Sequence, residues 1–290
     1  MIEATPVSPN TAALSKAADD HKYSHGHAFI ISGGPGKTGA ARLAARGALR
    51  IGAGLVTIAS PQSALSEVAA QTTAIMCRTL DGAPGLAEAL EDKRLNALCL
   101  GPGLGLGPDT QHLVLAALMS GRATVLDADA LTRFERNPEV LFDALHKKTV
   151  LTPHAGEFKR LFPDIAAKID APATEGSAYS KVDATREAAE RAGCTILLKG
   201  SDTVIAGSDG RTSINSSVYE RSAPWLATAG SGDVLAGFIT GLMARGFSSH
   251  DAAATGAWLH TECALAFGPG LIAEDLPEML PSVFRSLDVT

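Results

Sequence analysis

Residues 227–237 read Ala-Thr-Ala-Gly-Ser-Gly-Asp-Val-Leu-Ala-Gly, and this stretch indicates both how the chain folds and what it binds. Apolar side chains from Val234 to Met243 recur at helical spacing, which predicts a helix that begins near the second glycine. The start of such a helix presents unpaired N–H groups and a positive dipole end, which bind phosphate oxygens. Gly230 and Gly232 let the backbone approach a ligand closely, and Asp233 could accept a proton from an attacking hydroxyl. The alternative is a tight turn in which Asp233 only favours the helix dipole.

Short apolar runs precede this stretch, and small or polar residues follow each of them. The runs cover residues 28–32, 55–59, 97–100, 124–126, 149–151 and 195–198. Runs of this kind, partly β-branched and separated by Ala- and Leu-rich stretches, are typical of buried parallel strands. The predicted helices between and after them include 39–50, 183–192 and 249–267, the last with an N-cap at Ser248 or Ser249.

Residues 203–215 differ, because two strand-like runs flank Gly207-Ser208-Asp209-Gly210, which predicts a hairpin. We therefore expect an N-terminal arm over residues 1–21 and one doubly wound α/β domain over residues 22–290. Its central sheet should be mostly parallel, with helices on both faces. Ligands of such sheets bind beyond the carboxyl ends of the strands, where the polar residues of this chain gather.

The composition excludes several classes of function. The net charge of −6 gives no basic field for nucleic acid or for an anionic membrane. The four cysteines, at positions 77, 99, 194 and 263, lie far apart, and buried thiols in a reducing compartment are the expected state. The sequence carries neither a signal peptide nor an apolar stretch near the ~20 residues that span a bilayer. We expect a cytoplasmic protein.

Two further glycine-rich loops follow predicted strands. Residues 34–38 resemble the end of a P-loop, but Ile31 stands where that motif requires glycine. Residues 101–107 do not form the dinucleotide-binding pattern G-x-G-x-x-G. Each loop is either a site of close backbone approach to a ligand or a simple turn.

Acidic and basic side chains complete the predicted crevice. Asp127 and Asp129 flank Ala128; we expect only one of them to face the crevice, and Asp129 is predicted to be the N-cap of a helix over 130–134. One or two carboxylates near a transferred phosphate hold Mg²⁺, commonly through water. Lys199 is either a phosphate ligand or a surface residue, and His154 either touches substrate or is solvated.

Eight segments in order resemble the ribokinase-like superfamily, and more closely the NAD(P)H-hydrate dehydratases. They are HKYSHG (21–26), GAARLA (39–44), GALRIGAGLV (47–56), GPGLG (101–105), LDADAL (126–131), LTPHAGE (151–157), LKGSDT (198–203) and LATAGSGD (226–233). The family restores NADH or NADPH from the 6-hydroxylated hydrates, NADHX and NADPHX, and consumes ADP or ATP. The resemblance implies phosphorylation of the hydrate hydroxyl followed by loss of phosphate.

The resemblance also assigns residues. Asp233 matches the family's catalytic base. Nucleotide-binding positions are matched by Lys199, Gly200, Ser201, Asp202, Thr203, Ala229, Gly230, Ser231 and Gly232, and substrate-binding positions by Ala40, Ala41, Gly103, Gly105, His154 and Asp233. Glu157 and Asp127 match positions that support Mg²⁺ through water. Relatives are often tetramers, so a homotetramer is expected.

Two departures from the family pattern carry further expectations. A longer loop, 218–225, precedes the Gly-rich turn. Residues 1–21 are too short for the epimerase domain of many relatives, so we expect a separate epimerase and no consumption of the R epimer alone. The rival functions are a thiazole- or pyridoxal-type alcohol kinase of the same superfamily and a non-catalytic nucleotide sensor.

Overall fold

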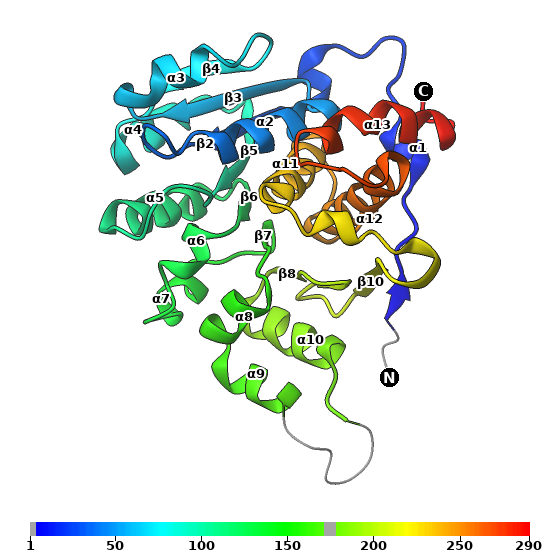
Figure 1. Ribbon diagram of the computed structural model, residues 1–290. Coiled ribbons are helices and arrows are strands. Elements are labelled where there is room, and N and C mark those ends of the chain that lie inside the picture. Colours follow the sequence, from blue (N-terminus) through cyan, green and yellow to red (C-terminus); the bar gives the residue numbers. More distant parts are fainter. Residues whose placement is uncertain (1–3, 171–177) are drawn as a thin grey trace.

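The structure is a computed structural model that describes residues 4–170 and 178–290. Within these ranges, ten strands form one sheet in the order β1-β10-β9-β8-β7-β6-β5-β2-β3-β4 (Figure 1). The strands are β1 (Thr5–Pro6), β2 (His27–Ile31), β3 (Leu55–Ser60), β4 (Met76–Thr79), β5 (Leu95–Leu100), β6 (Ala123–Leu126), β7 (Thr149–Leu151), β8 (Thr195–Leu198), β9 (Asp202–Ala206) and β10 (Thr212–Ser216). Only β9 runs antiparallel to its neighbours, β8 and β10. The predicted, mostly parallel sheet is confirmed.

Helices separate most of these strands along the chain. The α-helices are α1 (Thr11–Leu14), α2 (Gly39–Arg50), α3 (Leu65–Ala69), α4 (Gly82–Ala89), α5 (Pro108–Met119), α6 (Asp129–Thr132), α7 (Glu139–Phe142), α8 (Ala155–Leu161), α9 (Pro163–Asp170), α10 (Lys181–Ala192), α11 (Ser231–Ala244), α12 (Ser249–Phe267) and α13 (Asp275–Ser286). Shorter 3-10 turns are η1 (Lys22–His25), η2 (Gln62–Ala64), η3 (Tyr219–Arg221) and η4 (Pro224–Leu226).

The sheet separates two hydrophobic cores, because successive strand residues point to opposite faces. Ile30 packs on one face with α2, α11, α12 and α13. Its neighbours Phe29 and Ile31 pack on the other face with α4, α5, α8 and α10. Strands buried on both sides need continuous apolar runs, which explains why the sequence shows them without alternation. The prediction of helices on both faces is confirmed.

The elements that sequence patterns missed lie at the edges of the fold. The edge strand β4 exposes most of its side chains, with Met76 at 41 %, so it lacks an apolar run. The first three residues of the predicted N-terminal arm lie outside the described residues. The rest of the arm contains β1, which pairs in parallel with β10, and the short helix α1.

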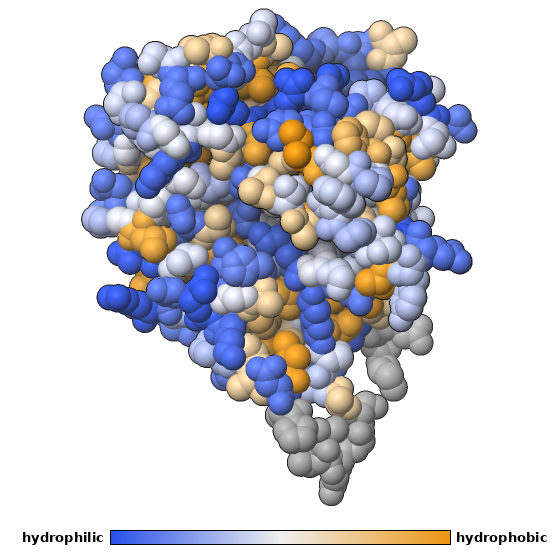
Figure 2. All heavy atoms as spheres, in the orientation of Figure 1, coloured by the Kyte–Doolittle hydropathy of each residue, from blue (hydrophilic) through white to orange (hydrophobic). Residues whose placement is uncertain are grey.

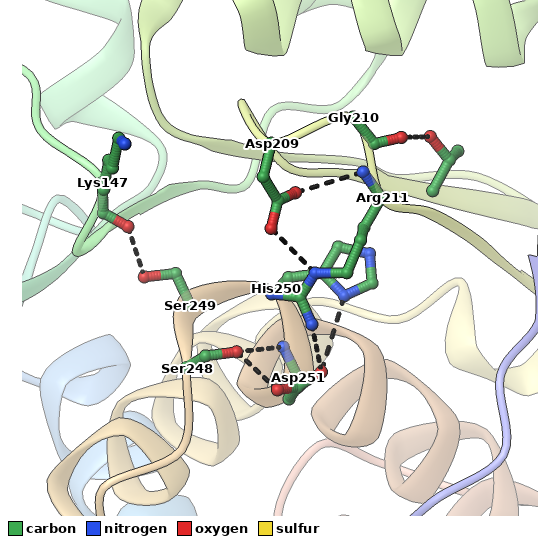
Figure 3. A network of polar contacts seen from close by, with 9 residues as sticks. Lys147, Asp209, Gly210, Arg211, Ser248, Ser249, His250 and Asp251 are labelled. Carbon is green, nitrogen blue, oxygen red and sulfur yellow. Dashed lines mark hydrogen bonds and ion pairs between the residues drawn. The ribbon is translucent and has the colours of Figure 1, made fainter. Parts of the chain in front are cut away.

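The antiparallel hairpin of β9 and β10 is fastened to the start of α12 (Figure 3). Arg211, just after the hairpin turn, contacts Asp209 within the turn and Asp251 in the first turn of α12. Ser248 is the N-cap of α12, as predicted, and accepts a hydrogen bond from the backbone N–H of Asp251. These contacts join the hairpin turn to the first turn of α12.

The face of the molecule seen in Figure 1 mixes hydrophilic and hydrophobic residues rather than presenting one large apolar patch (Figure 2). Among the described residues, no helix combines the length and the apolar character that crossing a bilayer requires.

Candidate functional site

A cavity of about 790 Å³ lies beyond the carboxyl end of β8, between the hairpin, the start of α11 and the later turns of α12. Its walls include seven of the predicted site residues: His154, Lys199, Gly200, Ser201, Thr203, Ser231 and Gly232. Apolar side chains such as Leu226, Leu235 and Ala257 line another part. A largely apolar hollow with a few convergent polar groups is the usual form of a small-molecule site.

The start of α11 carries no side-chain cap, so the N–H groups of Gly232 and Asp233 in its first turn remain available to a ligand, while that of Ser231 donates to Thr228 O. Gly230 stands at the N-cap with φ of 86°, a conformation that side chains rarely adopt. A Cβ on Gly230 would also lie 2.6 Å from Leu43 Cδ1 and 2.9 Å from Ala273 Cβ. The glycine is therefore required by both backbone conformation and packing, and the simple-turn alternative does not account for the open helix start.

Three charged side chains meet beside Gly232. Lys199, at the end of β8, places Nζ 2.8 Å from Oδ1 of the buried Asp127, at the end of β6. Burial raises the pKa of Asp233 to about 6, and the negative charge of Asp127 adds to the rise while Lys199 opposes it. Asp233 is thus half-buried, next to the helix start, with a pKa suited to a general base near neutral pH.

The segment after β6 turns sharply at Ala128, whose φ is 48°. The two carboxylates have different partners: Asp127 pairs with Lys199, whereas Asp129 contacts the backbone at Gly105. With Ala128 at the N-cap of α6, Asp129 is not the helix N-cap that was predicted. Its Oδ2 accepts a hydrogen bond from the backbone N–H of Gly105 at 2.7 Å and so fixes the second glycine-rich loop.

The two glycine-rich loops pack directly against each other. A Cβ on Gly33 would lie 1.9 Å from the carbonyl oxygen of Gly103, and a Cβ on Gly103 would lie 2.7 Å from that of Lys37. Gly103 and Gly105 have φ of 75° and 80°. Close backbone approach explains Gly33 and Gly103, whereas Gly105 has open space at its Cβ position and is favoured by its positive φ alone.

His154 and Glu157 form the N-terminal cap of α8. The Nδ1 of His154 accepts from the backbone N–H groups of Gly156 and Glu157, and Glu157 Oε2 accepts from the N–H of His154 at 2.8 Å. The imidazole is 56 % exposed and lines the cavity. The buried Glu157 carboxylate is therefore directed to its own helix start.

The described part of the chain contains no cluster of three or more His, Cys, Asp or Glu side chains arranged to hold a metal. Asp127 fits a looser role. One of its oxygens is paired with Lys199, and the other lies 3.9 Å from where a Cβ on Gly232 would be. A Mg²⁺ ion that arrives with a nucleotide needs only one or two carboxylates, because phosphate oxygens and water complete its shell. Asp127 therefore fits magnesium better than Glu157.

The other predicted residues do not line this cavity: Ala40, Ala41, Gly103, Gly105, Asp127, Glu157, Asp202, Ala229, Gly230 and Asp233. Ala41 belongs to the hydrophobic core at 2 % exposure, whereas Ala40, in the first turn of α2, is only partly buried. Ala40 is thus the better candidate of the two for ligand contact. Asp202 is exposed at the start of β9.

Sequence patterns missed a polar group at the back of the cavity. Asn215 donates to Ala257 O and to Thr261 Oγ1, and its own Oδ1 accepts from Arg221. His260 contacts the carbonyl oxygen of Ser231 at 2.9 Å. These residues come from β10, α12 and the loop between β10 and α11, so no local spacing in the sequence signals that they meet.

Comparisons with known proteins identify the family of the chain. The family model of NAD(P)H-hydrate dehydratase matches residues 28–280. The bifunctional NAD(P)H-hydrate repair enzyme Nnr of Moorella thermoacetica is 39 % identical over 287 residues, which cover 94 % of this chain and 52 % of that enzyme. The chain spans about half the length of the curated relatives it matches.

Solved structures confirm the ribokinase-like fold. The ADP/ATP-dependent NAD(P)H-hydrate dehydratase of Bacillus subtilis, co-crystallised with ATP and Mg²⁺, superposes with a TM-score of 0.75 at 25 % identity, over 97 % of this chain and 94 % of that one. A hydroxyethylthiazole kinase of Pyrococcus horikoshii shares the fold alone, with a TM-score of 0.55 at 15 % identity over 89 % and 87 % of the two chains. On the family match and the relatives together, this chain belongs to the NAD(P)H-hydrate dehydratase family.

Proposed function

We propose that this chain is an ADP- or ATP-dependent (S)-NAD(P)H-hydrate dehydratase that returns the (6S)-hydrate of NADH or NADPH to the intact cofactor. One observation carries the proposal beyond family membership. The half-buried Asp233 lies at an uncapped helix start, next to the paired charges of Lys199 and Asp127. A base, an array of N–H groups and a cation are the groups that phosphoryl transfer requires.

In the first step, the hydroxyl oxygen on C6 of the hydrate attacks the terminal phosphorus, and the shortened nucleotide leaves. Asp233 takes the hydroxyl proton, and the N–H groups of the first turn of α11 stabilise the charge on the transferred group. Lys199 brings a cation to this turn, with Nζ 3.6 Å from the Cβ position of Gly232. When bound, Mg²⁺ neutralises phosphate oxygens, and Asp127 is the residue that would hold it.

In the second step, the lone pair of the ring nitrogen expels inorganic phosphate from C6, and loss of a proton from C5 forms the double bond. The step needs a good leaving group and exclusion of water. Ala40, His154 and the loops that carry Gly103 and Gly105 are the proposed contacts for the hydrate. The nucleotide is assigned to the cavity beside Lys199.

The test is incubation of the purified chain with an epimer mixture of NADHX, Mg²⁺ and either ADP or ATP. We expect the reduced-nicotinamide absorbance to return together with one inorganic phosphate for each cofactor. An alcohol kinase would instead release a stable phosphate ester, and a nucleotide sensor would bind ADP without turnover. Either result would refute the proposal.

Three expectations accompany this function. Purified R epimer should persist until an epimerase is added, and steady loss without one would contradict this. We keep a homotetramer as a prediction, which analytical ultracentrifugation tests. We also keep a cytoplasmic location, which cell fractionation tests.

A further inference from the structure

His260 lies in the fourth turn of α12, and its imidazole reaches across to the first residue of α11. Its Nε2 is 2.9 Å from the carbonyl oxygen of Ser231. Because a carbonyl can only accept, Nε2 carries the hydrogen and donates it. The ring is 6 % exposed and lines the cavity beside Gly232. Burial lowers the pKa of His260 to about 4, so the neutral, donating form is present at neutral pH.

The carbonyl that His260 holds belongs to the same peptide group as the N–H of Gly232. A peptide group is planar, and the described chain contains no cis bond, so C=O and N–H point in opposite directions. Fixing the Ser231 carbonyl therefore fixes the direction of the Gly232 N–H, which points out of the helix start. Glycines at 230 and 232 leave this segment with little intrinsic stiffness, so an external constraint matters.

The ring itself cannot turn away easily. It meets the buried Phe238 edge-on, with ring centroids 6.1 Å apart and an interplanar angle of 82°. Phe238 belongs to α11, so the histidine touches the same helix through both its edge and its Nε2. For packing alone, an apolar ring would serve, because burying an imidazole costs free energy that only a hydrogen bond offsets.

We propose that His260 is a positioning residue for phosphate binding: its Nε2–H holds the peptide between Ser231 and Gly232 so that the Gly232 N–H faces the transferred phosphoryl group. The inference rests on the proposed function for its catalytic consequence. Its binding consequence is independent of turnover, because any ligand phosphate at this helix start meets the same N–H group.

The test compares His260→Phe, which keeps the ring and loses the donor, with His260→Gln, whose amide nitrogen can take the place of Nε2. Calorimetry measures the affinity of each for ADP and for adenosine, and kinetics measure kcat and KM for hydrate. We expect His260→Phe to bind ADP about tenfold more weakly and adenosine as the wild type does, with kcat lowered about tenfold. His260→Gln should recover most of both losses.

The matched control is His250→Phe, which replaces another buried histidine of the same helix away from the cavity. It should leave ADP affinity unchanged. Equal weakening of ADP and adenosine binding by His260→Phe, or a loss that glutamine does not restore, would overturn the inference. If the wild type binds ADP but does not turn over hydrate, the proposed function fails, while the contrast between ADP and adenosine still decides the role of His260.

Discussion

The Nζ of Lys199 lies 2.8 Å from Oδ1 of Asp127, although 72 residues separate them in sequence. The pair joins the ends of β8 and β6 directly beneath Gly232 at the start of α11. Asp127 is almost fully buried, with its side chain 3 % exposed, whereas Lys199 keeps 22 % of its side chain exposed. The pair thus holds a cation next to the helix start and leaves it accessible from the cavity.

This pairing predicts different outcomes for single and double substitutions. Lys199→Met strands a buried carboxylate, so we expect a loss of about 3 kcal/mol in the free energy of unfolding and weaker ADP binding. Adding Asp127→Asn removes the stranded charge and should restore most of the stability but not the affinity. Urea unfolding and calorimetry measure the two effects. A double variant as unstable as Lys199→Met would show that charge is not the cause.

Asp233→Asn should remove the base. We expect kcat to fall by about 10²- to 10⁴-fold while ADP still binds. The raised pKa of Asp233 also sets the pH profile: the base is ionised only above about pH 6, so wild-type kcat/KM should decline as pH falls through that value. Asp109→Asn, an exposed acid in the first turn of α5, is the matched control and should retain full activity.

The same carboxylate should cost stability at neutral pH. A folded-state pKa above the ordinary 3.8 means that the folded chain favours the protonated acid, so its contribution is lost as pH rises through about 6. At pH 7.5, Asp233→Asn should therefore have a higher melting temperature than the wild type. The corresponding gain in the free energy of unfolding should be no more than roughly 3 kcal/mol. Calorimetric scans at pH 5 and pH 7.5 test this, and an equal gain at both values would contradict it.

Much of this fold could be predicted because its signals are local. Each buried strand is an apolar run, and the start of α11 is marked by two glycines and an acid within four residues. The partners of these residues could not be predicted in the same way. The contacts of Lys199 with Asp127, of Asp129 with Gly105 and of His260 with Ser231 depend on which strands and helices become neighbours.

The positive φ of Ala128 also lay beyond sequence reasoning, since alanine rarely adopts that conformation. The sequence pattern suggested a helix after this segment, which is why Asp129 was predicted to be an N-cap. Glu157 is a second residue whose role in the structure differs from the role that the sequence suggested. Its spacing from His154 is that of a capping box, and the structure uses it as one, whereas the motif alone suggested magnesium.

The surroundings of His250, in the first turn of α12, lead to a prediction about how the stability of the fold depends on pH. The ring of His250 lies near Asp209 and Arg211 of the hairpin, and Nδ1 is 3.7 Å from Asp251 Oδ1 (Figure 3), too far for a hydrogen bond, so neither ring nitrogen has a hydrogen-bond partner in the described chain. Burial and then Arg211 lower the pKa of His250 below its ordinary 6.5. Below pH 6.5 the unfolded chain therefore binds a proton at His250 more readily than the folded chain does. The contribution of His250 to the free energy of unfolding is complete above pH 6.5 and is lost as the pH decreases.

We expect His250→Phe to reduce the difference in melting temperature between pH 7.5 and pH 5. His112→Phe, at an exposed position of α5, is the control and should leave that difference unchanged. Differential scanning fluorimetry at both pH values measures it. An unchanged difference in His250→Phe would mean that the acid sensitivity arises at other histidines.

The contacts of Arg221 lead to a prediction about the loop over residues 217–227, which lines the proposed nucleotide cavity. Its guanidinium contacts Glu262 Oε1, Asn215 Oδ1 and Ser216 O, and it lies over the ring of Trp258. The start of the loop is also held by the hydrogen bond from Ser217 N–H to Ser201 O and by the contact between Ser217 Oγ and Thr261 Oγ1, and its other backbone hydrogen bonds are made within it. Arg221 therefore fastens the middle of a segment that supplies the apolar wall of the cavity.

Arg221→Ala should raise the Kd for ADP about tenfold. Without Arg221 the loop has to be ordered when ADP binds, and this ordering reduces the free energy of binding. Stopped-flow measurements with a fluorescent ADP analogue should show the change mainly in the dissociation rate, since most differences in affinity at one site lie there. Glu220→Ala, at the exposed neighbouring position, is the control and should bind as the wild type does. If Arg221→Ala retains wild-type dissociation, the loop is held by its own backbone turns and the fastening is not needed for binding.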